Sequence, residues 1–349
     1  MARSRIAVLY DEWDEEAAEK AETASRAGRK RPRRKRGEPT EDIQEVFEAL
    51  KKGGHNPFYA VLDGTVESLL ALAHLEADLI FNLTESYRGD DTKDTNIAAY
   101  LDLLGRRYTG AGPEALYLAQ DKPLAKKIFS FHGIATPYFA TVFRGRLEHA
   151  QDIRFPLIVK PAREDGSIGI EFSAVVNSIK ELMERIDALH VSFDSPVLLE
   201  EYVEGREIYV AILGNDKPEA LPVVELDLSN LPDGTPKIAG TEVKWDKDTD
   251  IYRKTKPFFP DIDDETVEKI RSTAVAAFQA LKLRDYGRID IRLDREGKPH
   301  VLEVNPNPYL LPKAEFSLAA KKSGRCYADL INEIVELAQV RYRGAVLTA

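Results

Sequence analysis

Four polar residues stand near the C-terminal end of the chain, on two segments that read as neighbouring strands. In the first segment Arg288 and Asp290 alternate with isoleucines, and in the second Glu303 and Asn305 stand two positions apart, so each pair shares one face. A polar turn with glycine and proline joins the segments, and antiparallel pairing would bring Asp290, Glu303 and Asn305 together. Carboxylate and amide oxygens without His or Cys suit Mg²⁺, or Mn²⁺ in its place, beside bound phosphates. A solvated strand face with an ordinary salt bridge is the alternative for this pattern alone.

A lysine and a glycine loop upstream supply groups that phosphates need. The apolar segment 155–159 ends in Lys160, and a loop with Gly166, Ser167 and Gly169 follows it. The lysine contributes its charge and the flexible loop contributes backbone N–H groups, so the two together can hold nucleotide phosphates. The Gly-Lys-Ser/Thr order of a Walker A loop is absent from this segment. Together with the acidic cluster downstream, this arrangement indicates a nucleotide site with a metal.

In their order and spacing, these motifs resemble the ATP-grasp superfamily, and within it the D-alanine–D-alanine ligase-like carboxylate–amine ligases. The resemblance extends over most of the chain, from residue 82 to residue 338. Besides the segments already described, it includes residues 108–111, 121–126, 197–207 and 319–330. The motifs are specific at the level of superfamily and reaction type.

The resemblance implies that ATP lies between a central and a C-terminal domain. Lys122 and Lys160 match the lysines that contact the phosphates or the adenine side, and Ser167 belongs to the phosphate loop. Glu207 matches the carboxylate that faces the ribose, with a surface ion pair to Arg206 as the alternative. The adenine would meet backbone groups of the segment Glu200, Glu201, Tyr202 and Val203.

The resemblance also implies which residues do the chemistry. Arg288 matches the arginine that stabilises the anionic tetrahedral intermediate, and its alternative role is to balance the nearby carboxylates. The long loop 234–260 matches a mobile lid, in which Lys244 and Trp245 would face the site. The Mg²⁺ ligands of the family match Asp290, Glu303 and Asn305.

Several positions depart from the D-alanine ligases. The short Gly-rich loop with a glutamate that usually follows the first strand is replaced by the acidic run 11–16. Gly166 stands where a serine is usual in the central loop, and Ala314 where a serine usually holds the acceptor carboxylate. Tyr309 follows the metal asparagine where the family has glycine. The residues for ATP and the metal therefore match those of the family, while most residues that would bind D-alanine do not. This difference predicts other substrates.

Composition narrows the class of protein. The chain has 349 residues and a net charge of −10, which suits two or three domains and argues against general nucleic-acid binding. No apolar run is long enough to cross a bilayer, and the single Cys326 cannot form an internal disulfide, so we expect a cytoplasmic protein without membrane contact. The segment Arg26–Arg36 is basic, unlike the acidic chain as a whole. We interpret it as a solvated loop, with an anion-binding lid or a nucleic-acid arm as alternatives.

The alternation of strand and helix patterns predicts an α/β chain with α+β character in its C-terminal part. We expect an ATP-grasp fold of three domains: an N-terminal parallel-sheet domain, 1–112, with a basic insertion at 23–39, and two domains that sandwich ATP, 113–196 and 197–349. Segment 197–201 should open the last domain, one helix should carry Asp121 and Lys122, and one should span 317–340.

The function that follows is an ATP-dependent ligase that activates a carboxylate as an acyl phosphate and joins it to an amine. A genuine D-alanine–D-alanine ligase is the first alternative, and a non-catalytic ATP-binding regulatory protein is the second. The expected partners are small-molecule carboxylate and amine substrates, and the resemblance allows a homodimer.

Overall fold

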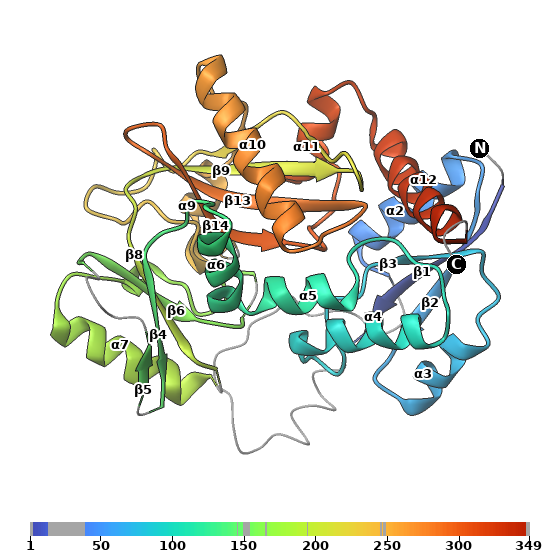
Figure 1. The fold of residues 1–349 in the computed structure, drawn as a ribbon, viewed down its shortest axis with the longest axis horizontal. Helices are drawn as coiled ribbons and strands as arrows, with labels where there is room; N and C mark the ends of the chain where they lie inside the picture. Colours follow the sequence, from blue (N-terminus) through green and yellow to red (C-terminus); the bar gives the residue numbers. More distant parts are fainter. Residues whose placement is uncertain are drawn as a thin grey trace.

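The computed structural model describes residues 3–12, 39–144, 146–148, 154–164, 166–193, 195–244, 246 and 249–346. Three sheets follow one another along the chain, and Figure 1 shows them from the blue N-terminal part through the green central part to the orange C-terminal part. The basic segment 26–36 and Trp245 lie outside the described residues. Within the described ranges, no helix is both long and apolar enough to cross a membrane.

The N-terminal sheet is parallel, as predicted, and has the order β2-β1-β3. Its central strand contributes a run of apolar residues that are fully buried, which is typical of a strand covered on both faces. Tyr108 extends this sheet by an isolated parallel bridge to Ile80. The elements of this part are β1 (Arg5–Asp11), α2 (Glu41–Lys52), β2 (Asn56–Leu62), α3 (Val66–Ala73), β3 (Leu79–Asn82), η1 (Asp91–Lys93) and α4 (Asp94–Leu103).

The central sheet has five antiparallel strands in the order β5-β4-β8-β6-β7. Val197–Glu201 was predicted to open the last domain. This strand, β8, instead belongs to the central sheet, because it pairs with both β4 and β6. The strands are β4 (Phe139–Phe143), β5 (Arg146–Glu148), β6 (Leu157–Pro161), β7 (Val175–Val176) and β8 (Val197–Glu201). The helices are α5 (Pro113–Gln120), α6 (Lys122–Phe131), η2 (Phe172–Ala174) and α7 (Ile179–Ser192).

Two helices carry the segment around Asp121, where one helix was predicted. Asp121 ends α5, and its side chain accepts a hydrogen bond from the backbone N–H of Leu124 at 3.0 Å, which caps the first turn of α6. Pro123 in that first turn favours a helix start, since its missing N–H would have no partner there. The break therefore sets the direction of α6, which carries two buried lysines, Lys122 and Lys126.

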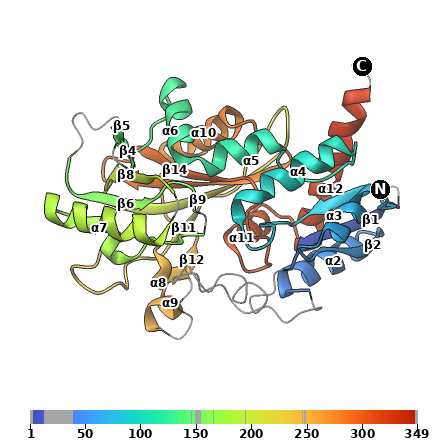
Figure 2. The ribbon, with the colours of Figure 1, turned by 90° about the horizontal axis from the view of Figure 1, so that it is seen from below.

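The C-terminal sheet has the order β12-β11-β9-β13-β14, with β10 also paired to β9. Helices cover both faces: α10 and α6 lie on one side of the sheet, and α8 and α9 lie on the other (Figure 2). Along β9, Ile208 and Val210 pack toward α10, whereas Tyr209 and Ala211 face α11. The elements are β9 (Gly205–Leu213), β10 (Glu219–Ala220), β11 (Val224–Leu226), β12 (Pro257–Phe258), α10 (Asp264–Ala280), β13 (Tyr286–Asp294), β14 (Pro299–Asn305), α11 (Glu315–Lys322) and α12 (Tyr327–Val346).

Two further segments differ from the sequence prediction. The loop 234–260 contains two short helices, α8 (Thr241–Lys244) and α9 (Asp250–Lys254), as well as β12. The helix expected over 317–340 is divided into α11 and α12, because a turn with Gly324 in the left-handed region, φ 93°, interrupts it. The second of these helices, α12, packs against α2 and β3, so a C-terminal helix covers the N-terminal sheet (Figure 1).

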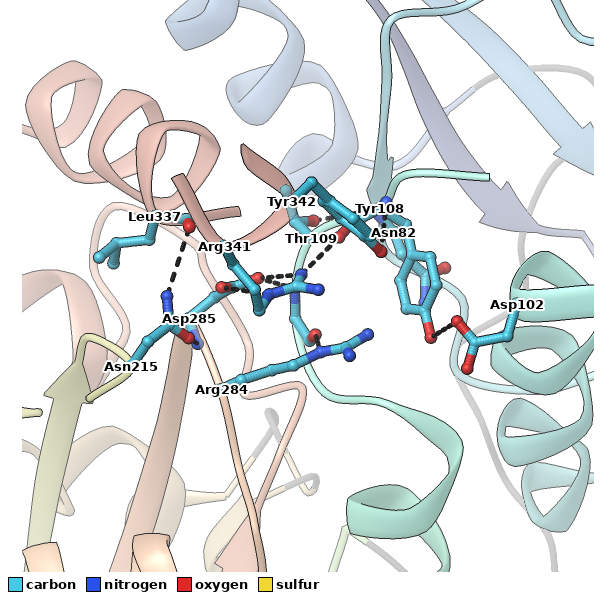
Figure 3. Close-up of polar contacts among 11 residues, drawn as sticks. Asn82, Asp102, Tyr108, Thr109, Asn215, Arg284, Asp285, Leu337, Arg341 and Tyr342 are labelled. Carbon is cyan, nitrogen blue, oxygen red and sulfur yellow. Dashed lines mark hydrogen bonds and ion pairs between the residues drawn. The ribbon is translucent and has the colours of Figure 1, made fainter. Parts of the chain in front are cut away.

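A buried polar network joins the N-terminal part to the start of β13 (Figure 3). Asp285, fully buried, accepts two hydrogen bonds from Arg341 of α12, at 3.1 and 2.8 Å, and one from the backbone N–H of Gly110 at 2.9 Å. Arg341 also donates to the carbonyl of Tyr108 at 2.8 Å, and Arg284 donates to the carbonyl of Gly110 at 2.9 Å. The network therefore fixes the strand that carries the polar cluster against the N-terminal part.

Candidate active site

The two predicted strands are β13 and β14, and they pair antiparallel as expected. In this register Asp290 lies opposite Glu303, and Arg288 lies opposite Asn305. The register shifts after Asp290, so that Ile291 lies opposite Val301, which is typical of a β-bulge. The structure therefore brings the four residues of the sequence motif together at one place on the sheet.

Arg288 and Asp290 form a close pair on β13. Arg288 donates from Nε and Nη2 to the two carboxylate oxygens of Asp290, at 2.7 and 2.9 Å. Its Nη1 lies 3.8 Å from a carboxylate oxygen of Glu315, and its guanidinium lies 4.9 Å from the ring centre of Tyr209. Burial raises the pKa of Asp290 to about 6, an effect that Arg288 opposes and the nearby charge of Glu303 reinforces.

Glu303 lies among several cations. The Nζ atom of Lys122 is 3.6 Å from its carboxylate. Burial acts to raise the pKa of Glu303, but the charges of Lys122, Lys244, Lys160 and Arg288 outweigh it and lower this pKa to about 2. The local field therefore favours anions, and Glu303 stays ionised.

The oxygen donors fit a hard divalent cation. Asp290 and Glu303 offer carboxylates from paired positions, and Asn305, two residues after Glu303, offers an amide oxygen. The raised pKa of Asp290 indicates a buried carboxylate whose charge is incompletely compensated. The described residues contain no group of three or more His, Cys, Asp or Glu that could hold a metal. The third donor at this place would therefore be the amide oxygen of Asn305.

A pocket between the central and C-terminal sheets, here called the polar pocket, adjoins this cluster. Lys122, Arg288 and Asn305 do not line it: Lys122 contacts Glu303, Arg288 contacts Asp290, and Asn305 lies opposite Arg288 in the sheet. The other predicted site residues all line it: Lys160, Ser167, Glu200, Glu201, Tyr202, Val203, Glu207, Lys244, Asp290 and Glu303. The remaining lining is mostly apolar and consists of Pro137, Ile158, Ile170, Ile238, Ala239, Arg292 and Leu302.

Glu207 is held by residues of the C-terminal sheet. Its carboxylate accepts a hydrogen bond from the hydroxyl of Tyr209 at 3.1 Å and lies 3.5 Å from Arg292. The alternative partner, Arg206, pairs instead with Glu225. Glu207 therefore enters the pocket as a buried, oriented carboxylate.

The glycine loop lies against the segment that precedes α8. The hydroxyl of Ser167 donates to the carbonyl of Ala239 at 3.0 Å, and Thr241 donates from its backbone N–H to the carbonyl of Ile170 at 2.7 Å. Ser167 has a φ of 63°, in the left-handed region, so this loop has a specific conformation. The contact brings the predicted lid residue Lys244, at the end of α8, to the polar pocket.

Two residues of the site were missed as candidates by the sequence reasoning. Arg292 lines the pocket, pairs with Glu207 and lies 5.8 Å from the ring centre of Tyr202. It shares the strand face of Asp290, so the alternation that identified Asp290 could have identified it. Lys126 lies 2.6 Å from the carboxylate of Glu200, and no local signal separates this buried lysine from an exposed one.

Comparisons with known proteins identify the family. The sequence profile described as D-ala D-ala ligase C-terminus matches residues 128–336. The uncharacterized protein y4sG of Sinorhizobium fredii is 36% identical over 266 residues, which are 76% of each chain. The D-alanine–D-alanine ligase of Cupriavidus metallidurans is 30% identical over 300 residues, 84% of this chain and 85% of the relative.

A solved structure supports the same fold. The D-alanine–D-alanine ligase of Bacillus anthracis complexed with ATP superposes with a TM-score of 0.68 at 20% identity, over 98% of this chain and 99% of that one. This likeness shows the fold, which is the predicted ATP-grasp fold with a parallel N-terminal sheet and antiparallel sheets after it. The chain therefore belongs to the D-alanine–D-alanine ligase family of ATP-dependent carbon–nitrogen ligases.

Proposed function

We propose that this enzyme uses ATP to activate a small carboxylate substrate as an acyl phosphate and then joins it to an amine in the cytoplasm. The observation that carries this proposal is the continuity of the polar pocket. It is lined both by Glu200 to Val203 with Glu207 and by Asp290 with Glu303. A nucleotide in this pocket would have its base at the first group of residues and its phosphates at the second.

The residues of the pocket divide into base-side and phosphate-side groups. Backbone groups of Glu200, Glu201, Tyr202 and Val203 would hold the adenine, and Glu207 would accept from the ribose hydroxyls. Lys122, Lys160 and Lys244 would hold the phosphates together with Ser167 and its loop. A Mg²⁺ ion held by Asp290, Glu303 and Asn305 would neutralise phosphate charge.

The proposed reaction has two steps. A carboxylate oxygen of the first substrate attacks the terminal phosphorus of ATP, the bond to the bridging oxygen breaks, and ADP leaves. The amine then attacks the acyl carbon, phosphate leaves, and the amine nitrogen loses a proton to give the amide. Arg288 would stabilise the negative oxygen of the tetrahedral intermediate, since a fixed cation is worth most where charge develops in a buried site.

The substrates are proposed to differ from D-alanine. Tyr309 is half exposed, and its neighbours Asn307 and Pro308 line a second pocket with Tyr286 and Glu85. Ala314, in the position before α11, offers no hydroxyl, and Gly166 offers none in the central loop. A site without these polar groups cannot hold the acceptor carboxylate in the same way.

The relatives named as D-alanine–D-alanine ligases favour a second candidate, a genuine enzyme of that activity. A non-catalytic ATP-binding protein is the third, and the retention of Arg288 with Asp290, Glu303 and Asn305 argues against it. Phosphate release should be measured with ATP and Mg²⁺ over pairs of amino acids and other small acids and amines. We expect a pair without D-alanine to give the highest rate, whereas absence of release with every pair, D-alanine included, would support the non-catalytic candidate.

We also propose three domains. The boundary near residue 112 lies between the N-terminal sheet and α5. The second boundary is proposed after Glu201 instead of after residue 196, because β8 completes the central sheet.

A further inference from the structure

A buried chain of three charges lies behind the polar pocket. Glu200 of β8 is shared by two lysines, with Lys126 Nζ at 2.6 Å from one carboxylate oxygen and Lys160 Nζ at 2.7 Å from the other. All three residues are buried, with 0% of Lys126, 1% of Glu200 and 4% of Lys160 exposed. Lys160 and Glu200 line the pocket, but Lys126 stands one layer behind them, on α6.

The charges of this trio do not cancel. Two ammonium groups share one carboxylate, so the trio retains a net positive charge at and just behind the wall of the pocket. Burying an ion is costly unless a partner compensates it, so the presence of a second buried lysine is weak evidence for a role in stability. Without Lys126, Glu200 would neutralise Lys160 alone, and Lys160 would offer the pocket little charge. With Lys126 present, Glu200 is divided between two cations, and positive charge remains at the pocket wall.

Lys126 also connects the pocket to the strand of the acidic cluster. Its Nζ contacts the hydroxyl of Thr136 at 2.5 Å, and this hydroxyl donates to the carbonyl of Val301 on β14 at 2.8 Å. The backbone N–H of Val301 donates in turn to the carbonyl of Ala135 at 2.8 Å. Val301 lies at the bulge, two residues before Glu303. One side chain therefore touches the central sheet and, through Thr136, the C-terminal sheet.

We propose that Lys126 is a positioning residue for the nucleotide: it takes up part of the charge of Glu200, so that Lys160 keeps its charge for the phosphates of the ligand. This inference rests on the proposed function, in which Lys160 faces the phosphates of ATP. A purely structural role for Lys126 would affect stability and all ligands of the pocket alike. The proposed role predicts a loss that depends on the phosphates.

The test compares ATP with adenosine, which lacks phosphates. Lys126→Met removes the charge at similar length and leaves Glu200 paired with Lys160, so the variant should fold. The exposed neighbour Lys127 provides the matched control, as Lys127→Met. Dissociation constants for ATP with Mg²⁺ and for adenosine should be measured by calorimetry on the full chain, with melting curves for each variant. We expect the preference for ATP over adenosine to fall by about tenfold or more in Lys126→Met, which is the effect of losing one charged contact, and to stay unchanged in Lys127→Met.

A second measurement needs no loss of the side chain. Burial lowers the pKa of Lys126 to about 8, with Lys160 acting in the same direction and Glu200 and Glu303 opposing it. Lys126 is therefore charged below about pH 8 and neutral above it, where ATP phosphates are already ionised. The preference for ATP should fall as the pH rises through this value in the natural chain, and should stay constant in Lys126→Arg.

The outcomes separate the two proposals. An unchanged preference in folded Lys126→Met, or equal losses for ATP and adenosine, would overturn the role of Lys126 while the proposed function stands. A pH-independent preference in the natural chain would overturn it as well. If the natural chain binds no ATP, both the proposed function and this inference fail.

Discussion

Arg288 and Asp290 stand two residues apart on β13 and are joined by two hydrogen bonds, at 2.7 and 2.9 Å. The residue proposed to stabilise the reaction intermediate is thus the direct partner of a residue proposed to hold Mg²⁺. Each one favours the charged form of the other, since Arg288 opposes the rise in the pKa of Asp290 that burial causes, and Asp290 helps to raise the pKa of Arg288. A change at either residue should therefore affect both binding of the cation and the chemical step.

The acidic cluster should be required for turnover. Asp290→Asn, Glu303→Gln and Asn305→Ala should each lower turnover by about a hundredfold or more, as expected when a fixed electrostatic contact is removed. Folding should change little, because each variant is nearly isosteric or shorter and Arg288 keeps the carboxylate of Glu315 nearby when Asp290 is replaced. Turnover is measured as phosphate release against Mg²⁺ concentration with a substrate pair that supports activity. If Glu303→Gln retains nearly the natural rate, the assignment of these residues to the cation is wrong.

Loss of the guanidinium at Arg288 should act mainly on the chemical step. Arg288→Met should lower kcat by about a hundredfold, with a smaller effect on the KM for ATP, because the proposed charge acts on an intermediate and not on bound nucleotide. Arg295, with 76% of its side chain exposed, is the control on the turn after the same strand. Arg295→Met should have natural kinetics. An Arg288→Met variant whose only defect is in the KM for ATP would contradict the assignment.

D-Alanine should be a poor substrate. The hydroxyls expected at positions 166 and 314 are absent, and Tyr309 stands where a glycine is usual. Steady-state kinetics with D-alanine as both substrates decide the matter. A kcat/KM of about 10⁴ M⁻¹s⁻¹ or more, which is in the ordinary enzyme range, would show a genuine D-alanine–D-alanine ligase. Ala314→Ser should raise this value if the missing hydroxyl limits binding of the acceptor.

Lys244 should protect the activated intermediate. It lies at the end of α8, lines the polar pocket and contributes to the positive field around Glu303. Lys244→Ala should raise the ratio of ATP hydrolysed to amide formed, because a less closed site admits water to the acyl phosphate. Lys254 of α9, in the same loop and with 60% of its side chain exposed, provides the control as Lys254→Ala. If the ratio of ATP hydrolysed to amide formed is unchanged in Lys244→Ala, Lys244 has no role in closing the site.

The hydrogen-bond network around Asp285 should contribute strongly to the stability of the contact between the N-terminal part and β13. Arg341→Met leaves a fully buried carboxylate without its cation, and such losses lower the free energy of unfolding by about 3 kcal/mol or more. Arg343, on the exposed side of the same helix, is the control. Arg343→Met should change stability by less than about 0.5 kcal/mol. Denaturant titration gives both values, and equal stability of the two variants would show that the Asp285–Arg341 pair contributes little.

Much of the site could be predicted because its signals are local. Alternation of polar and apolar residues determines which side chains of a strand share a face, so Asp290, Glu303 and Asn305 could be grouped before any fold was known. The start of α6 was equally readable, since Asp121 followed by Pro123 is a typical helix start, although the prediction joined it to α5.

Other features depend on contacts between distant segments, and no local pattern contains them. The strand Val197–Glu201 reads the same in either sheet, and only its pairing with β4 and β6 assigns it to the central one. Lys126 belongs to the segment 121–126 that carries the resemblance, yet no local pattern shows that the fold buries it against Glu200, 74 positions away, and Thr136. The sequence alone therefore determined which polar side chains share a strand face, through a periodicity of two. The tertiary structure decided which charges are shared, because the energy of a buried charge depends on what the rest of the chain places beside it.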